Sequence, residues 1–384
     1  MSREVVVVAY GRSPMAKAIK GSLVNIHPVE YGAQVLTAVL NKVPELKWDQ
    51  IDDIVFGCGK PEKLLGENIA RMVALRAGVP CTVPALQINR FCSSGLQAIT
   101  TAANEILAGQ ADITVAGGIE VMNRESTGFP MEYHNAWLEE NTDIYISMGL
   151  TAENVAKEYN VTREDEDAFA FRSQKRAAAA RAAGRFDEEI VPIQSKNFEG
   201  EDIVCAKDEC IRESTTLEGL AGLKPVFSAD GLVTAGNSSQ LSDGCAVVVL
   251  MSAEKAAELG VKPIAKFVSF AVTGVEPNMM GIGPIYAIPK ALERAGLKKE
   301  DMDVIELNEA FASQSIAVIR TLGLDEEKVN PNGGAIAMGH PLGATGAMLT
   351  CKLLGELKRR NGKYGMVTMC IGGGQGAAGI FELL

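Results

Sequence analysis

The chain contains few histidines and no cysteine pair with the spacing of a metal site. Its 384 residues include three histidines (His27, His134 and His340), and no C-x-x-C pair occurs among its eight cysteines. Because zinc is usually held by closely spaced Cys and His ligands, we expect no bound metal. The wide scatter of the cysteines also argues against a disulfide framework and favours a reducing, cytoplasmic setting.

Excess positive charge and long apolar runs are missing as well. Lys and Arg total 37 against 48 Asp and Glu, for a formal net charge of −11, which disfavours a general nucleic-acid binder. The apolar run from Val5 to Ala9 is far shorter than the roughly 20 residues that span a bilayer. We therefore expect neither nucleic acid nor a membrane as a partner, although a local basic site for an anionic ligand stays open.

Nucleotide-binding motifs are missing too. The glycine-rich stretch CIGGGQG, from Cys370 to Gly376, follows a buried apolar run. No Gly-Lys-Ser/Thr comes after it, which excludes a Walker-type loop. The stretch also does not form a G-x-G-x-x-G that opens a helix, as a dinucleotide site requires. A turn of this kind can instead point backbone N–H groups at a developing oxyanion.

What the sequence does contain is an alternation of buried strands with helices, which predicts a parallel or mixed sheet covered by helices. In the first part, the expected strands are 4–10, 52–57, 85–89 and 112–118, and the expected helices are 28–41, 68–78 and the segment that begins at residue 92. From 120 to about 241 the pattern resembles an insertion: 120–150 is irregular, and 151–181 is strongly helical, with Thr162 and Asp165 as a capping box. The alternation then resumes with strands at 245–251, 264–271, 303–307 and 364–370, and helices at 286–296, 310–323 and 344–359.

The second part of the chain repeats the order and spacing of the first. Asp53-Ile-Val-Phe corresponds to Asp303-Val-Ile-Glu, and Cys92-Ser-Ser-Gly before a helix corresponds to His340-Pro-Leu-Gly before a helix. Strand 113–118 likewise corresponds to 366–373. Two similar α/β halves explain this agreement, and a site between them would draw on equivalent turns of each half.

The most informative stretch runs from Gln87 to Gly109, where a polar elbow, Asn89-Arg90-Phe91, delivers Cys92 to the start of a helix. The apolar positions of that helix are Leu96, Ile99, Ala103, Ile106 and Leu107, and Gly109 is its expected stop. Unpaired N–H groups and the helix dipole at this end favour the thiolate, which is the nucleophilic form. We therefore expect Cys92 to be a covalent nucleophile. The alternative for a single cysteine among small residues is an inert buried side chain.

Three further stretches carry candidate polar groups. The segment 330–346, NPNGGAIAMGHPLGATG, places His340 just ahead of a helix, where it could take a proton near neutral pH or be an ordinary loop histidine. Asn308, in LNEAFA at a strand-to-helix junction, could orient a water or a carbonyl oxygen, or could simply cap the helix. The segment 230–244, DGLVTAGNSSQLSDG, could lay its backbone against an elongated ligand, or form ordinary turns.

Together, these motifs resemble those of the thiolases, the acyltransferases that make or cleave 3-ketoacyl-CoA. In chain order they are NRFCSSG, GLVTAGNSSQLSDG, LNEAFA, NPNGGAIAMGHPLGATG and CIGGGQG. The resemblance covers essentially the whole chain from Arg12 onward. It implies an α/β fold of two similar βαβαβαββ halves, packed as α-β-α-β-α layers, with an inserted loop domain. On this basis we assign 1–265 to the N-terminal half, about 120–241 to the loop domain within it, and 266–384 to the C-terminal half.

The resemblance also implies catalytic roles. Cys92 would be the nucleophile that forms the acyl-thioester, His340 would activate it, and Cys370 would donate and accept the proton at the α-carbon. Asn308 would hold a water in one oxyanion hole, to which His340 also contributes. The backbone N–H groups of Cys92 and Gly372 would form the other hole. No metal or prosthetic group enters this scheme, and CoA serves as a substrate.

Further positions are implied for CoA binding. Arg212 would lie near the adenine and phosphate end, and Phe311 would lie near the acyl end. The residues implied along the pantetheine path are Phe227, Ala235, Gly236 and Ser239. The family also implies CoA thioesters as ligands, a homodimer or homotetramer, and association with other enzymes of fatty-acid β-oxidation.

One departure from the family bears on the substrate. Thiolases that make acetoacetyl-CoA usually carry His-Met-Gly where this chain has Ser147-Met148-Gly149. The missing histidine and the Asn-Arg-Phe-Cys elbow favour a degradative 3-ketoacyl-CoA thiolase over an acetoacetyl-CoA-specific acetyl-CoA C-acetyltransferase. A ketoacyl synthase of the same fold fits less well, because it would carry a second histidine where Cys370 stands. A non-catalytic CoA-binding paralogue also fits less well, because it would have lost Cys92, His340 or Cys370.

Overall fold

The computed structural model describes residues 3–122, 131–197 and 199–384. A mixed sheet runs through them in the order β10-β11-β12-β9-β1-β8-β5-β3-β4, and the short strand β2 pairs with β8. Its strands are β1 (Val5–Arg12), β2 (Ala16–Lys17), β3 (Asp53–Gly57), β4 (Ala85–Ile88), β5 (Ile113–Glu120), β8 (Ser242–Ser252), β9 (Ala265–Gly274), β10 (Met302–Leu307), β11 (Tyr364–Ile371) and β12 (Gln375–Leu383). The strand expected at 366–373 ends at Ile371, because Gly373 and Gly374 take positive φ angles in the turn that leads into β12, a strand not anticipated from the sequence.

The sheet consists of two equivalent sets of strands, which confirms the internal repeat. In one set, β3 is parallel to β5, which is antiparallel to β8, which is antiparallel to β1. In the other, β10 is parallel to β11, which is antiparallel to β12, which is antiparallel to β9. The sets meet where β1 pairs with β9 through Val6–Lys266 and Val7–Ala265.

A hydrogen-bond pattern shared by the two sets corrects the alignment of the repeat by one residue. The Asp303 carboxylate accepts the backbone N–H groups at the start of β11, from Lys363 at 2.6 Å and Tyr364 at 3.1 Å. In the first set, Asp52 does this for Asp112 and Ile113, at 2.8 and 3.0 Å. Asp303 therefore corresponds to Asp52 rather than to Asp53.

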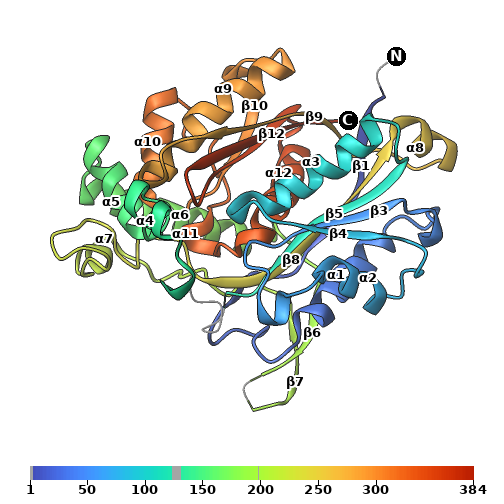
Figure 1. Ribbon diagram of the computed structural model, residues 1–384, viewed down its shortest axis with the longest axis horizontal. Coiled ribbons are helices and arrows are strands. Elements are labelled where there is room, and N and C mark those ends of the chain that lie inside the picture. Colours follow the sequence, from blue (N-terminus) through green and yellow to red (C-terminus); the bar gives the residue numbers. More distant parts are fainter. Residues whose placement is uncertain (1–2, 123–130, 198) are drawn as a thin grey trace.

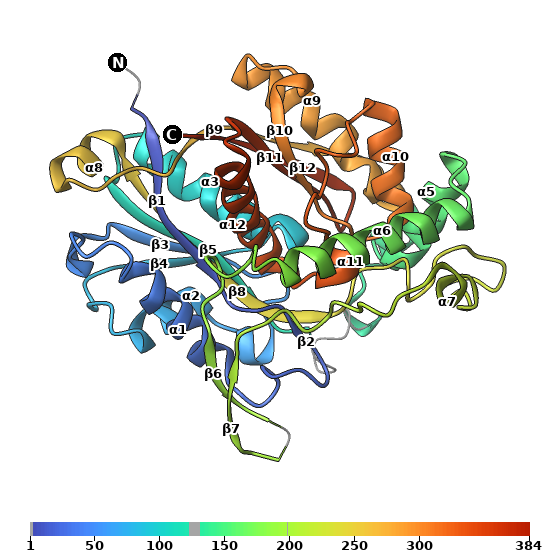
Figure 2. The ribbon, with the colours of Figure 1, turned by 180° about the vertical axis from the view of Figure 1, so that it is seen from behind.

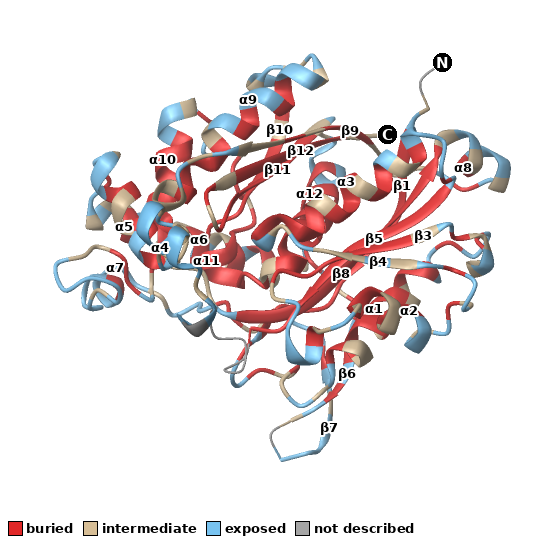
Figure 3. Ribbon diagram, viewed as in Figure 1, coloured by how far each residue is buried: buried red, intermediate tan, exposed pale blue. Residues whose placement is uncertain are grey.

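Helices cover both outer faces of the sheet sets and fill the space between them (Figure 1). On one outer face lie α1 (Pro28–Leu40) and α2 (Ile69–Arg76); on the other lie α9 (Gly283–Ala295) and α10 (Ala312–Leu322). Between the two sets of strands lie α3 (Ser94–Leu107) and α12 (Leu342–Arg360). The buried apolar residues accordingly form three large clusters: one between each outer pair of helices and its strands, and one around the central helices. Figure 3 draws the strands and much of α12 as buried. This is the layered α-β-α-β-α arrangement expected from the sequence.

The two central helices approach each other closely at glycines. A Cβ on Gly95 of α3 would lie 2.8 Å from the backbone of both Gly343 and Ala347 of α12. A Cβ on Gly346 of α12 would lie 2.7 Å from the Leu96 side chain of α3. Such distances are far below normal van der Waals contact, so side chains here would force the helices apart. Because Cys92 and His340 precede these helices, the glycine contacts set how near those two residues lie.

The helix that follows Cys92 has the apolar face expected for it, with one exception. Leu96, Ile99, Ala103 and Ile106 are fully buried in the central layer, whereas Leu107 is 43% exposed. The helix ends at Leu107, just before Gly109, whose φ is +73°. Leu107 sits on the side of the last turn that faces solvent, so it makes no contribution to the core.

The segment between β5 and β8 is spread over two places in Figure 2, with its helices toward the right of the view and its hairpin projecting at the bottom. It contains α4 (Ala136–Asn141), α5 (Met148–Glu158), α6 (Arg163–Ala182), the hairpin β6 (Ile193–Lys196) and β7 (Asp202–Cys205), and α7 (Leu217–Ala221). Thr162 and Asp165 form the expected capping box at the start of α6. Part of the region expected to be irregular, 123–130, lies outside the described residues.

The remaining elements are short. They are α8 (Ala253–Leu259) and α11 (Ala335–Met338), and the 3-10 turns Trp48–Gln50, Lys63–Leu65, Phe91–Ser93, Met131–Tyr133, Pro277–Ile282 and Lys299–Asp301. Among the helices of the described ranges, none combines the length and the apolar character needed to cross a bilayer. The same ranges contain no group of three or more His, Cys, Asp or Glu side chains arranged to hold a metal ion.

Replacing Gly95 tests the contact between the central helices. Gly95→Ala places a methyl group 2.8 Å from two backbone atoms of α12, so we expect a loss of about 1–3 kcal/mol in the free energy of unfolding, measured by urea denaturation. Gly222→Ala is the matched control, because its new Cβ would meet no atom closer than 3.5 Å; we expect a change within about 0.5 kcal/mol. Equal stability of the two variants would contradict the proposed constraint.

Candidate active site

A pocket of about 840 Å³ opens beside the start of the two central helices, and its lining is mainly apolar. Cys92 and His340, which come from equivalent positions of the two halves, both line it. Of the residues expected to bind CoA, Phe227, Ala235, Ser239 and Phe311 line the same pocket. The structure therefore brings motifs separated by nearly 250 residues to one cavity.

Two expected CoA contacts lie beside the pocket lining. Arg212 donates to Oε1 of the lining residue Gln240 at 3.0 Å. The backbone N–H of Gly236 donates to Thr234 Oγ1 at 3.1 Å, and a Cβ on Gly236 would come within 2.6 Å of Leu220. Gly236 thus lets its loop pack closely on α7.

The elbow before Cys92 is held in an uncommon backbone conformation. Phe91 has a φ of +43°, in the left-handed region that bulky residues rarely adopt. Its N–H donates to Asn89 Oδ1 at 2.8 Å, and its carbonyl oxygen accepts from Ser94 Oγ at 2.7 Å. The same Ser94 oxygen accepts the N–H of Arg90 at 2.8 Å. These short contacts stabilise a strained turn that presents Cys92 to the pocket.

The ionisation of Cys92 differs from the sequence expectation. Burial raises the pKa of its thiol to about 11, although the backbone N–H groups of Gly372 and of Cys92 itself lower it. Desolvation of the sulfur thus outweighs the helix N-terminus, so the prediction of a favoured thiolate was wrong for the resting protein. The thiol must lose its proton during the reaction, which requires a base.

His340 has the environment of such a base. Its ring is buried, and burial lowers the pKa of the imidazole to about 4, so it is neutral at physiological pH. Nδ1 lies 2.7 Å from Thr345 Oγ1, and Nε2 lies 3.4 Å from Asn308 Nδ2. Because the Asn308 amide nitrogen is a donor, Nε2 carries the lone pair and Nδ1 donates its proton to Thr345. Nε2 therefore carries the lone pair that can accept a proton, once the long contact with Asn308 gives way.

Asn308 is a buried polar group rather than a helix cap. The N-cap of α10 is Phe311, so the capping alternative for Asn308 was wrong. Its backbone N–H donates to Thr368 O on β11 at 2.9 Å. Within the described part of the chain, its side-chain oxygen is buried without a hydrogen-bond partner. A buried amide oxygen of this kind is suited to hold a polar ligand atom or a water.

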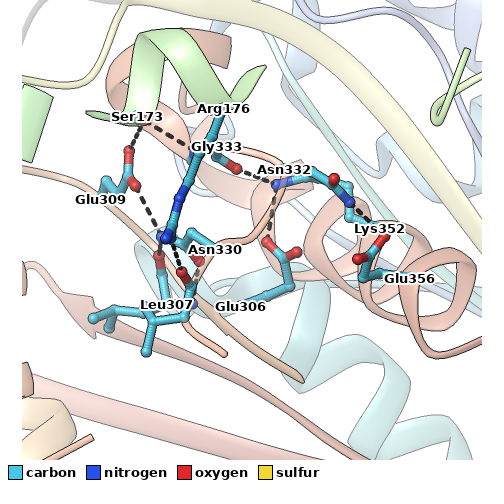
Figure 4. A network of polar contacts seen from close by, with 12 residues as sticks. Ser173, Arg176, Glu306, Leu307, Glu309, Asn330, Asn332, Gly333, Lys352 and Glu356 are labelled. Carbon is cyan, nitrogen blue, oxygen red and sulfur yellow. Dashed lines mark hydrogen bonds and ion pairs between the residues drawn. The ribbon is translucent and has the colours of Figure 1, made fainter. Parts of the chain in front are cut away.

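A buried polar network anchors the loop that carries Asn308 (Figure 4). Asn330 exchanges hydrogen bonds with the backbone of Leu307, at 2.9 and 2.7 Å, and its amide also donates to Glu309 at 2.9 Å. Glu309 accepts from Ser173 of α6 at 2.6 Å. Nearby, the buried Lys352 ammonium pairs with Glu306 at 2.9 Å. The residues on either side of Asn308 are therefore fixed.

Cys370 lies at the end of β11, opposite Gly376 of β12, and is fully buried. Burial and the nearby Cys92 raise the pKa of its thiol well above the ordinary value. The following turn requires glycine: Gly373 and Gly374 have φ angles of +79° and +82°, and a Cβ on Gly374 would come within 2.8 Å of Pro277 N. This turn presents the Gly372 N–H to Cys92.

Two residues at the site were not anticipated from the sequence. Gln314 accepts a hydrogen bond from the Cys370 thiol at 2.9 Å, and only its position shortly after LNEAFA could have pointed to it. Glu120, at the end of β5, accepts the N–H groups of Gly59 and Gly343, each at 2.7 Å, and burial raises its pKa to about 7. A carboxylate at the end of a buried strand was the available signal for Glu120.

Comparison with known proteins gives consistent matches over the full chain. The family described as "Thiolase, N-terminal domain" matches residues 5–254, and "Thiolase, C-terminal domain" matches residues 261–383. A 3-ketoacyl-CoA thiolase of Bacillus subtilis is 53% identical, over 99% of this chain and 100% of that protein. An acetyl-CoA acetyltransferase of Syntrophomonas wolfei is 47% identical, over 100% of both. The crystal structure of a Bacillus anthracis acetyl-CoA acetyltransferase superimposes with a TM-score of 0.92 at 43% identity, over 100% of this chain and 99% of that one.

The protonation states of Cys92 and His340 lead to a test by alkylation. With a thiol pKa of about 11 and an imidazole pKa of about 4, we expect the rate of Cys92 alkylation by iodoacetamide to rise about tenfold per pH unit between pH 7 and 9. The rate would be followed by mass spectrometry of the Cys92 peptide, with Cys370→Ala as the control for the second thiol. A rate independent of pH between 5 and 8 would indicate a thiolate–imidazolium pair instead.

Proposed function

The chain belongs to the thiolase family, as an acyltransferase that uses CoA as a substrate, and we propose that it cleaves 3-ketoacyl-CoA through an acyl-Cys92 intermediate. The observation that carries this proposal is that Cys92 and His340 line the same apolar pocket. The Cys370 thiol is near enough to Cys92 for the two to interact electrostatically. The reverse Claisen condensation uses the same groups.

The first step is attack by Cys92 on the 3-keto carbon. His340 Nε2, which carries a lone pair, accepts the thiol proton as the sulfur adds to the carbonyl group. Because the resting thiol has a raised pKa, deprotonation is coupled to attack and the thiolate does not accumulate. The backbone N–H groups of Cys92 and Gly372, which already point at this sulfur, are suited to stabilise a developing oxyanion beside it.

The second step breaks the C2–C3 bond and leaves acetyl-CoA as an enolate. Cys370 donates its proton to C2, so the enolate becomes acetyl-CoA and Cys92 keeps the acyl group. The thiol of a second CoA then attacks the acyl-Cys92 thioester and releases the shortened acyl-CoA. Two thiols are needed because one is occupied as a thioester while the other transfers protons. The unpartnered Asn308 oxygen, beside His340, supports a water-filled second oxyanion hole.

For the substrate, we propose the degradative 3-ketoacyl-CoA thiolase over an acetoacetyl-CoA-specific acetyl-CoA C-acetyltransferase. Ser147 lines the pocket and is also the N-cap of α5, where its oxygen accepts from Leu150 N. A serine leaves more room there than the histidine usual in acetoacetyl-CoA-forming thiolases, which favours longer acyl chains. The name of the Bacillus subtilis relative, 3-ketoacyl-CoA thiolase, agrees with this choice.

The organisation of the chain is also a proposal. We place the boundary between halves after residue 265 and the loop domain at about 120–241, because β9 starts at Ala265 and the inserted elements lie between β5 and β8. A homodimer or homotetramer, a cytoplasmic location and association with other β-oxidation enzymes remain predictions.

The proposed reaction is tested by CoA-dependent cleavage of 3-ketoacyl-CoA substrates of increasing chain length. We expect wild type to cleave chains longer than four carbons, and Cys92→Ala and Cys370→Ala to lose at least about 10³-fold in kcat, since each removes a group that forms or breaks bonds. Cleavage of the four-carbon substrate alone would overturn the degradative assignment. Full activity of Cys92→Ala would overturn the mechanism.

The Ser147 position is tested by introducing the histidine. We expect Ser147→His to lower kcat/KM for long-chain substrates about 10- to 100-fold relative to the four-carbon substrate, because the larger ring fills the pocket. Ser147→Ala is the matched control: it weakens the helix cap but leaves the space, so the ratio between long and short substrates should stay near that of wild type. An unchanged ratio in Ser147→His would exclude this position from chain-length selection.

A further inference from the structure

Gln314 contacts the second catalytic thiol directly. It lies in the first turn of α10 and is fully buried. Its side-chain oxygen Oε1 accepts a hydrogen bond from Cys370 Sγ at 2.9 Å, a short distance for a bond to sulfur. A thiol is a weak hydrogen-bond donor. The group that accepts its hydrogen bond therefore influences how readily the thiol ionises.

The orientation of the Gln314 amide is fixed by its nitrogen. Nε2 donates to Ser315 Oγ at 2.6 Å and faces the Asn308 carbonyl oxygen at 3.4 Å. Ser315 Oγ in turn donates to the Phe311 carbonyl oxygen at 3.1 Å, so it accepts from Gln314. A flipped amide would set oxygen against two acceptors. The group that faces Cys370 is therefore an acceptor that cannot donate.

Cys370 belongs to a small cluster of buried apolar residues. The side chains packed around it are Ala152, Val233, Met280, Ala310, Phe311 and the half-buried Met148. The titratable group that acts on Cys370 is Cys92, whose thiol is uncharged at rest. In such surroundings, an acceptor favours S–H and repels a thiolate.

We propose that Gln314 is a positioning residue for the proton-transfer step, whose oxygen holds Cys370 in the resting enzyme as the protonated thiol that the enolate requires. This inference rests on the proposed function, because it assumes that Cys370 exchanges the α-proton. In cleavage, the S–H bond of Cys370 breaks, a C–H bond forms at C2 of the enolate, and the S–H electron pair stays on sulfur. The Cys370 thiolate, which the Gln314 oxygen destabilises, then takes the proton of the incoming CoA thiol as the CoA sulfur attacks acyl-Cys92.

Two partial reactions separate this role from a structural one. Deuterium exchange at C2 of acetyl-CoA in D2O, followed by NMR, reports Cys370, whereas acetyl transfer from acetyl-CoA to dephospho-CoA reports Cys92. Gln314→Met removes the acceptor and keeps the size of the side chain. We expect the rising limb of the exchange rate to shift to lower pH by about 1 unit, the size of one neutral hydrogen bond. Because burial keeps the Cys370 thiol protonated at pH 7 in both proteins, we expect kcat for cleavage to fall by less than about tenfold, through poorer orientation of the S–H group, with acetyl transfer reduced less still.

A second variant covers the case in which Gln314→Met does not fold. Ser315→Ala removes the main acceptor that orients the amide, so we expect a shift in the same direction but smaller. Ser269→Ala is the matched control, because it also removes a buried hydroxyl that donates to a helix carbonyl oxygen, here that of Ala291 at 2.8 Å. We expect its exchange profile to equal that of wild type. An unchanged exchange profile in both Gln314→Met and Ser315→Ala overturns the inference. Exchange that persists in Cys370→Ala instead overturns the proposed role of Cys370.

Discussion

The close contact between the two central helices is the constraint on which the rest of the structure depends. Gly95 and Gly346 let α3 and α12 approach until backbone and side-chain atoms touch, inside a layer covered by strands on both faces. Each helix begins just after a reactive side chain, Cys92 or His340. The distance between nucleophile and base is thus decided by helix packing, and the loops that carry them only complete the geometry. Glu120 adds to this by joining the loop after β3 to the first turn of α12.

Burial then decides the chemistry of the groups so placed. The same exclusion of water raises the pKa values of both thiols and lowers that of the imidazole, so all three groups are neutral at rest. A neutral site can accept an apolar acyl chain without first desolvating a charge. Charge then appears only as bonds change, and the groups that meet it are backbone N–H groups and amides already fixed by hydrogen bonds.

Much of this could be predicted from the sequence, because it depends on local patterns. The apolar spacing after Cys92, the capping box at Thr162 and the repeated strand–turn–helix order each follow from neighbouring residues, and the structure contains all three. The ionisation of Cys92 could not be predicted, since the local helix effect is opposed by burial that only the folded layers create. Gln314 and Glu120 were missed for a similar reason: both meet their partners across large sequence separations. The strand β12 was not recognised in the sequence, because it directly follows a glycine-rich turn.

The shared central layer has a consequence for how such a chain could have arisen or could be divided. The first set of strands packs against both central helices, the second set packs chiefly against α12, and the seam between the sets is short, at Val6–Lys266 and Val7–Ala265. Neither half can cover its inner surface alone, so a single half would have to associate with a second copy to fold. An exchange of halves between relatives would likewise succeed only where both parents keep small residues at the helix crossing. Duplication and fusion of one self-associating unit would give a single chain with two identical turns at the helix starts. Each turn could then change independently, one to carry a thiol and the other an imidazole.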